Sequence, residues 1–270
     1  VDDDGKADFN NIQAAVDIAS DGDEIVVMPG TYTGTNIEVI NPLGKSITIR
    51  SSDGPEVTII DAEGTRRGVT FETGEGADTI IEGFTITGGT GGPQGNYGGG
   101  INCSNSSPTI KDCIIDGNTA NNGGGIWCNG NTDTQASPTI IDCIIRNNVA
   151  STGGGIYLGT NSHPSLTDCL IENNVTNWLY GKGGGIHCAA NNTLTLTACT
   201  LSGNSSKTGD GIFVSGVSIV SIIDANTSDT ILCEGGVRLI FNTGSTLDVL
   251  GNCTPASEGA LSMDLDDLYA

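Results

Sequence analysis

Residues 121–152 read NNGGGIWCNGNTDTQASPTIIDCIIRNNVAST, and residues 153–182 start the same pattern again with GGGIYLGTNSHPSLTDCLIENNVTNWLYGK. Five such units occur, and their first residues are Gly98, Gly123, Gly153, Gly183 and Gly209. Successive units therefore begin 25, 30, 30 and 26 residues apart. A fixed period of about 20 to 50 residues is typical of a solenoid, in which each unit packs only on its neighbours.

Three apolar positions recur in the same register in each unit. They are Ile101, Ile126, Ile156, Ile186 and Ile212; Ile110, Ile140, Leu166 and Leu196; and Ile115, Ile145, Ile171 and Leu201. Each lies in a short segment that alternates apolar and polar residues and ends at Gly, Asn or Asp, which is typical of a strand followed by a tight corner. Stacked at about 4.8 Å, such strands bury a continuous column of like side chains. The sequence predicts an all-β fold, a parallel β-helix.

The N-terminal region is predicted to form a lid on this solenoid. Residues 8–20, DFNNIQAAVDIAS, place Phe9, Ile12, Val16 and Ala19 on one helical face, with Asp8 as the expected N-cap. An amphipathic helix would cover the open apolar end of the first coil. We expect one domain with a cap at 1–22, coils at 23–253 whose clearest repeats lie at 98–215, and an acidic tail at 254–270.

Two polar columns and the cysteines follow the same repeat. The columns are Asn118, Asn148, Asn174 and Asn204, and Asp112, Asp142 and Asp168, the second series ending at Ala198. Asn and Asp tolerate left-handed backbone and can hydrogen-bond along a stack, so both columns have a structural explanation.

Most of the nine cysteines should be free buried thiols at repeat positions, with Cys233 and Cys253 as the expected exception. The spacing of the cysteines is that of the repeat and is not that of a zinc site.

Charge limits the partners. The formal net charge of −22 would repel nucleic acid and anionic membranes over most of the surface, so we exclude nucleic acid. Uronate polymers would need bridging cations or a basic patch, which ten scattered Lys and Arg residues do not obviously supply. No run of 18 apolar residues occurs, so no membrane insertion is expected.

Three segments carry a family resemblance: DFNNIQAAVDIASDGDEIVVMPGTYTGTNIEV at 8–39, GKSITIRSSDGPEVTIIDAEG at 44–64 and IEGFTITGG at 81–89. Together with the GGGI units, they resemble the secreted right-handed parallel β-helix proteins of the pectate-lyase-like superfamily. The resemblance implies a right-handed β-helix in an extracellular or cell-surface location. It does not imply one activity, because that superfamily includes lyases, hydrolases, esterases and adhesins. Its GHG and RIK hydrolase segments are missing, and GGIHC at His187 does not match them.

The residue after each unit's first isoleucine should point outward, because strand side chains alternate. These residues are Asn102, Trp127, Tyr157, His187 and Phe213. Trp127, Tyr157 and His187 would form an exposed stripe that can stack on sugar rings, and Trp178 and Tyr180 could wall the same surface. The alternatives are aromatic side chains that stiffen an exposed sheet, and contact with a partner or a second copy.

A second outward column contains Asp116, Arg146 and Glu172. Asp116 and Glu172 would lie two coils, or about 9 to 10 Å, apart, near the upper limit for an inverting carboxylate pair. A charge-alternating ladder looks the same, and Arg146 between them should keep both carboxylates ionised. With His187, these residues are the weak catalytic candidates. The segment VDDDGKAD at 1–8 is acidic but lacks the spacing and distal Glu of a helix-loop-helix Ca²⁺ site. Ca²⁺ is left open there without a specific motif to support it, and no metal site and no cofactor is predicted.

The resulting expectation is an extracellular or cell-surface β-solenoid with a non-catalytic binding or structural role, whose aromatic stripe meets a polysaccharide or a surface protein. A polysaccharide lyase or glycoside hydrolase is the first alternative. A self-associating surface-layer or filament subunit is the second.

Overall fold

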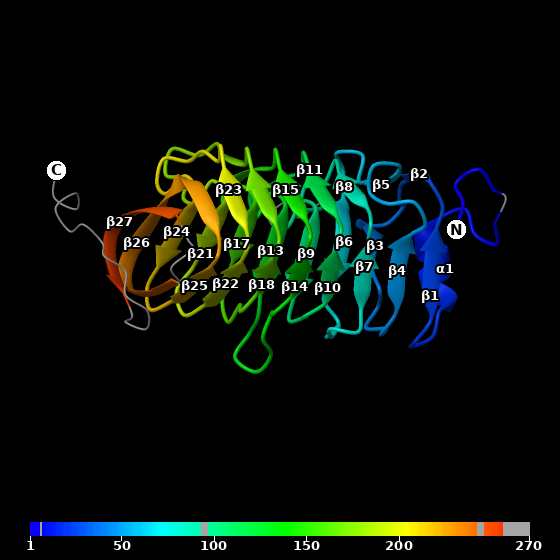
Figure 1. Cartoon of the computed structure of the whole chain (residues 1–270). Helices are drawn as coiled ribbons and strands as arrows, with labels where there is room; N and C mark the ends of the chain where they lie inside the picture. The colour runs from blue at the N-terminus through cyan, green and yellow to red at the C-terminus, as the bar shows by residue number, and fades with distance from the viewer. Residues whose placement is uncertain (6, 93–96, 242–245, 256–270) are drawn as a thin grey trace.

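The computed structural model describes residues 1–5, 7–92, 97–241 and 246–255. It forms a single β-solenoid with one short helix at its N-terminal end (Figure 1), which confirms the predicted all-β parallel fold. All strand pairs of the described chain are parallel, and most join each strand to its equivalent in the next coil. In Figure 1 the coils follow one another from α1 and β1 at one end to β26 and β27 at the other.

Each coil contributes one strand to each of three stacks, which we call the first, second and third faces in chain order. The first face comprises β1 (Glu24–Val27), β4 (Thr48–Ser51), β7 (Ile80–Glu82), β10 (Thr109–Lys111), β14 (Thr139–Ile141), β18 (Ser165–Thr167), β22 (Thr193–Thr197) and β25 (Ile219–Ile223). The second face comprises β2 (Gly30–Tyr32), β5 (Thr58–Asp61), β8 (Thr85–Thr87), β11 (Ile114–Asp116), β15 (Ile144–Arg146), β19 (Leu170–Glu172) and β23 (Thr200–Ser202).

The third face, which positions the candidate site, comprises β3 (Glu38–Ile40), β6 (Arg67–Phe71), β9 (Ile101–Ser104), β13 (Ile126–Asn129), β17 (Ile156–Leu158), β21 (Ile186–Cys188) and β24 (Ile212–Ser215). A small sheet of β12 (Thr119–Asn122), β16 (Val149–Thr152) and β20 (Val175–Thr176) lies between the second and third faces in the chain. The long strand β26 (Asn226–Phe241) pairs with all three faces and with β27 (Thr246–Pro255).

The core consists of the predicted apolar columns. Pairs such as Ile126 with Ile156 and Ile115 with Ile145 are in direct register, and all four side chains are fully buried. Like side chains therefore stack on one another through the centre of the coils, as the repeat predicts.

The N-terminal helix α1 (Ile12–Ile18) is shorter than the predicted helix. Ile12, Ala15 and Val16 are buried, and the helix contacts β1 and β3, as expected of a lid. The expected cap at Asp8 is wrong: Asn11 is the N-cap, and its side chain accepts a 2.8 Å hydrogen bond from the Ala14 N–H. Of the predicted acidic tail at 254–270, residues 254–255 belong to β27 and the rest lies outside the described residues.

The Asp and Asn columns have different structural roles. Asp112, Asp142, Asp168 and Ala198 all adopt left-handed backbone with φ near +50°. The Asn column instead forms an amide ladder, in which each Nδ2 donates to the next Oδ1: Asn118 to Asn148 at 3.1 Å, and Asn148 to Asn174 and Asn174 to Asn204 at 3.0 Å. The ladder ends at Asp229, whose carboxylate accepts from Asn204 at 2.7 Å.

Seven cysteines are free and buried, as predicted: Cys103, Cys113, Cys128, Cys143, Cys169, Cys188 and Cys199. Cys233 is disulfide-bonded, and the side chain of Cys253 lies outside the described part of the chain. Burial raises the pKa of Cys188 to about 12, and it also raises the pKa of Cys103 well above its ordinary value.

We expect these thiols to be unreactive in the native protein, because all seven are buried and closed to solvent. Titration with a disulfide reagent at pH 8 should show only trace reaction, and the seven thiols should react promptly once guanidinium is added. Rapid reaction of several thiols without denaturant would contradict the closed core.

No helix among the described residues is long and apolar enough to cross a bilayer.

Candidate functional site

The most distinctive surface of the described chain is the outward column of the third face. Residues Thr70, Asn102, Trp127, Tyr157, His187 and Phe213 follow one another in direct register on six successive strands. We call this set the outer column. Its neighbours inward are the buried isoleucines, so strand alternation directs the column away from the core, as predicted.

The aromatic rings along the column touch one another in two groups. Trp127 stacks on Tyr97, with ring centroids 4.8 Å apart and an interplanar angle of 30°. The His187 ring meets Tyr157 edge-on at 4.8 Å and Phe213 at 5.2 Å. Offset and edge-on contacts at these distances are favourable for aromatic rings, so the stripe is preorganised.

The exposure of the side chains changes along the column. The expectation that His187 is exposed is wrong. Trp127 and Tyr157 are half-buried, whereas His187 is 8% exposed and Phe213 is fully buried. Asn102 at the other end is 4% exposed. His187 is enclosed because Tyr157 and Phe213 pack on either side of it and Lys182 lies over the Phe213 ring at 4.2 Å. The accessible rings are therefore those in the middle of the column.

The loop before β21 carries two exposed aromatic side chains, and their predicted role in walling the stripe stays a prediction. Trp178 and Tyr180 are 58% and 71% exposed, and Leu179 between them is exposed as well. The Gly181 N–H donates to the Trp178 carbonyl at 3.0 Å, so these residues form a tight turn. Lys182 at its end links the turn to the outer column through Phe213.

Three polar atoms in the outer column are buried and have no hydrogen-bond partner: Thr70 Oγ1, Asn102 Oδ1 and His187 Nδ1. An unpartnered buried polar atom costs about 1–3 kcal/mol, and native proteins keep few of them. Half of the six such side-chain atoms in the described chain lie in this one column. All three atoms are covered by the protein itself, so the part of the column that a ligand can reach consists of the half-buried Trp127 and Tyr157 rings.

His187 is held neutral. Burial first, and the Lys182 ammonium second, lower the pKa of His187 from 6.5 to about 4. At neutral pH its imidazole therefore carries no charge and offers one donor and one acceptor nitrogen. The sequence analysis named His187 as a weak catalytic candidate, and that role stays a prediction.

This pKa makes stability depend on pH. Between pH 6.5 and 4 the unfolded chain protonates His187 while the folded chain does not, so the folded state loses stability as pH falls. We expect wild type to lose about 2 kcal/mol relative to His187→Gln between pH 6.5 and 4.5. Guanidinium unfolding at both pH values measures the difference, and equal losses in both proteins would contradict the buried neutral imidazole.

The other candidate residues lie elsewhere. Asp116, Arg146 and Glu172 are in register on the second face, so they do not share a site with the outer column. Arg146 Nε donates to Asp116 Oδ2 at 3.0 Å, and Asn147 Nδ2 donates to Asp116 Oδ1 at 2.9 Å. Asp116 is thus engaged through both oxygens, which is the arrangement expected of the charge ladder. A catalytic role for these three residues stays a prediction.

The described residues contain no group of three or more His, Cys, Asp or Glu side chains arranged for a metal. In the acidic N-terminal segment, Asp3 Oδ2 instead accepts from the Thr31 N–H at 2.9 Å.

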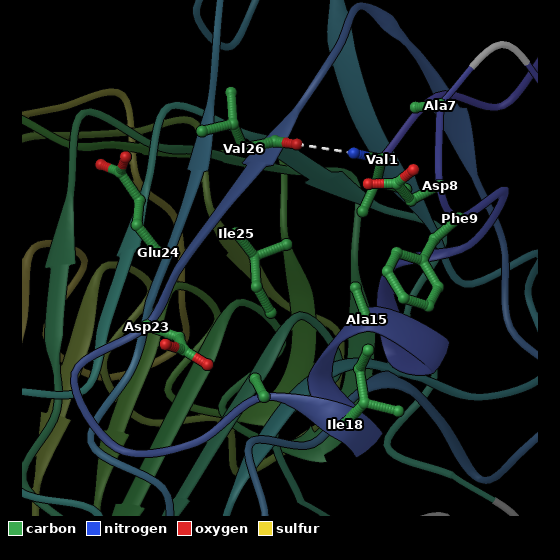
Figure 2. Close-up of a pocket in the computed structure, with 11 residues that line it drawn as sticks. Val1, Ala7, Asp8, Phe9, Ala15, Ile18, Asp23, Glu24, Ile25 and Val26 are labelled. Carbon is green, nitrogen blue, oxygen red and sulfur yellow. Dashed lines mark hydrogen bonds between the residues drawn. The ribbon is translucent and has the colours of Figure 1, made fainter.

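A cavity of about 370 Å³ lies between the cap and the first coil (Figure 2). Phe9, Ala15, Ile18 and Ile25 contribute apolar lining, and the Val1 ammonium donates to the Val26 carbonyl at 2.7 Å. None of the buried unpartnered polar atoms of the described chain belongs to this lining. The cavity is the seam of the lid, and the outer column is the stronger candidate site.

Several residues of the site escaped the sequence analysis. Tyr97 was missed although it precedes the first glycine triplet, and Lys182 although it precedes the fourth. Thr70 lies on a coil without a triplet, so the repeat did not extend to it. Arg67, whose Nε donates to the Tyr97 carbonyl at 3.0 Å, gave no signal in the sequence.

Comparison with solved structures shows the same fold. Pectin methylesterase from carrot has a TM-score of 0.58 and 14% identity, over 95% of this chain and 87% of that one. Pectate lyase Pel9A has a TM-score of 0.59 and 14% identity, over 99% and 82%. Pectin methylesterase from Aspergillus niger has a TM-score of 0.51 and 11% identity, over 95% and 89%. At these identities the likeness extends to the fold alone.

No curated protein matches the sequence significantly. The family described as "Right handed beta helix region" matches residues 23–228, which is most of the chain and includes every strand of the outer column. The resemblance to pectate-lyase-like β-helix proteins is thereby confirmed at the level of the fold. The chain belongs to the right-handed β-helix family.

Proposed function

We propose that this protein is an extracellular or cell-surface β-solenoid that binds glycans without cleaving them, through the outer column and its flanking rings. One observation carries the proposal: the half-buried rings of Trp127 and Tyr157 lie in direct register on two neighbouring coils. A sugar ring has an apolar face that stacks on indole or phenol and a rim of hydroxyls that needs hydrogen-bond partners. Trp127 and Tyr157 supply the stacking surface for the apolar face.

The geometry also suits an extended ligand. Residues of the column repeat once per coil, at about 4.8 Å, and they continue over six strands. A polysaccharide lying along the column would meet accessible rings on the two middle coils, which carry Trp127 and Tyr157. Trp178 and Tyr180, exposed on the turn before β21, are two further aromatic side chains open to a ligand.

The test is affinity electrophoresis against a polysaccharide panel, with product assays run in parallel. Trp127→Ala combined with Tyr157→Ala should weaken retention at least about tenfold, because two stacking platforms are lost. Ile18→Ala, which removes an exposed apolar side chain at the cap, is the control and should bind as wild type. Equal retention of the double variant would refute this surface as the binding site.

The assays also separate the alternatives. New reducing ends or unsaturated products that disappear with Asp116→Ala or His187→Ala would replace the proposal with an enzymatic one. Concentration-dependent sedimentation without retention on any polysaccharide would favour self-association.

A further inference from the structure

The charges beside the outer column indicate which class of glycan it takes. Two cations reach the column. At one end, Arg67 Nε donates to the carbonyl of Tyr97, the residue whose ring stacks on Trp127. At the other end, Lys182 lies over the ring of Phe213.

Both cations already face carboxylates of the protein. Lys182 Nζ pairs with Glu234 Oε2 at 3.1 Å. Arg67, the first residue of β6, is in direct register with Glu38 on the neighbouring strand, and Glu72 follows the last residue of β6. Burial, with the Glu72 carboxylate second, raises the pKa of Glu38, while Arg67 opposes that rise. The charges of two carboxylates, Glu72 and Glu38, therefore act on the one guanidinium at this end of the column.

The unpartnered atoms of the column are all uncharged. They are a threonine hydroxyl, an amide oxygen and a nitrogen of an imidazole that stays neutral at physiological pH. They are also buried, so they neutralise no charge that a ligand brings to the surface. They offer no compensation to a carboxylate, and a buried charge without a partner is strongly unfavourable.

Deepening the proposed function, on which this step rests, we infer that the outer column selects uncharged hexose chains and rejects uronate chains. A uronate polymer brings one negative charge per sugar against two cations, of which Lys182 is already paired, in the field of a chain with net charge −22. Lys207, exposed on the loop before β24, is a further cation, and it lies beyond the column. One lysine does not match a charge that repeats with every sugar.

Matched polymers test the inference. Glucan, galactan and mannan are each compared with the same polymer oxidised at C6 to the uronate, by affinity electrophoresis at pH 7 with EDTA. At least one neutral polymer should be retained, and its oxidised form should bind at least about tenfold more weakly. Equal or stronger retention of the oxidised form would overturn the inference and leave glycan binding intact. Absence of retention on every polymer would overturn both the inference and the proposed function.

A charge variant tests the cause. Glu38→Gln with Glu72→Gln removes the carboxylates around Arg67 and leaves Trp127 and Tyr157 in place. We expect retention of the oxidised polymers to rise several-fold while retention of the neutral polymer stays as in wild type. Glu24→Gln, which frees Arg50 on the first face from its ion pair, is the matched control and should change neither. Gain of uronate binding in the control, or none in the double variant despite an unchanged thermal midpoint, would contradict the inference.

Discussion

Replacing Asn148 with alanine is expected to destabilise the protein by about 3–5 kcal/mol, as estimated from the penalty for unsatisfied buried groups. Asn148 lies in the middle of the amide ladder and is fully buried. Its Oδ1 accepts from the backbone N–H of Asn118 at 2.9 Å, and its Nδ2 donates to the Ile115 carbonyl at 2.9 Å. Alanine leaves that N–H and that carbonyl buried without these partners, and it breaks the ladder between Asn118 and Asn174.

Guanidinium unfolding followed by circular dichroism measures the loss. Asn177→Ala is the matched control, because Asn177 is exposed on the loop after β20, and its midpoint should stay close to wild type. A midpoint for Asn148→Ala equal to that of the control would show that the ladder adds nothing to stability.

Gly154→Ala is expected to cost about 3 kcal/mol or more, at the upper end of the range for overpacked sites. A methyl group at Gly154 would lie 2.5 Å from the Gly184 carbonyl oxygen and 2.8 Å from both the N and the O of Val175. All three atoms are backbone atoms of the neighbouring coil, so no side chain can rotate away. Relief would require two coils to separate, which would disturb the pairing of β17 with β21.

Gly76→Ala controls for the general effect of replacing glycine. A methyl group there meets nothing within 4 Å, and Gly76 does not have left-handed backbone. Its unfolding midpoint should match that of wild type within experimental error. If Gly154→Ala is equally well tolerated, the coils are less tightly spaced than the structure has them.

Both predictions concern the corner before the third face, and they connect stability with the candidate site. Gly155 comes next to Gly154, and a methyl group there would lie 3.0 Å from Asn174 Nδ2, so the ladder and the triplet pack on each other. This corner leads directly into β17, which carries Tyr157. The spacing of the rings along the outer column is therefore set by the glycines and asparagines behind it.

The sequence by itself determined the fold, because the residues that stack on one another recur with a regular period along the chain. The isoleucine columns specify which side chains stack, and the glycine triplets occur where only a hydrogen fits between coils. The outward register of Trp127, Tyr157 and His187 followed from strand alternation alone. Each of these inferences needs only the period and the geometry of a strand.

Only the tertiary structure decided which of the outward side chains reach solvent and which are enclosed. The period places His187 and Tyr157 in equivalent positions, yet one is buried and the other half-exposed. The difference comes from Lys182, Phe213 and the neighbouring rings. The stacking of Tyr97 on Trp127 and the hydrogen bond from Arg67 to the Tyr97 carbonyl likewise join coils through a loop that does not repeat. A repeat fixes where a side chain points, whereas burial, pKa and free hydrogen-bonding atoms depend on what irregular segments bring against it.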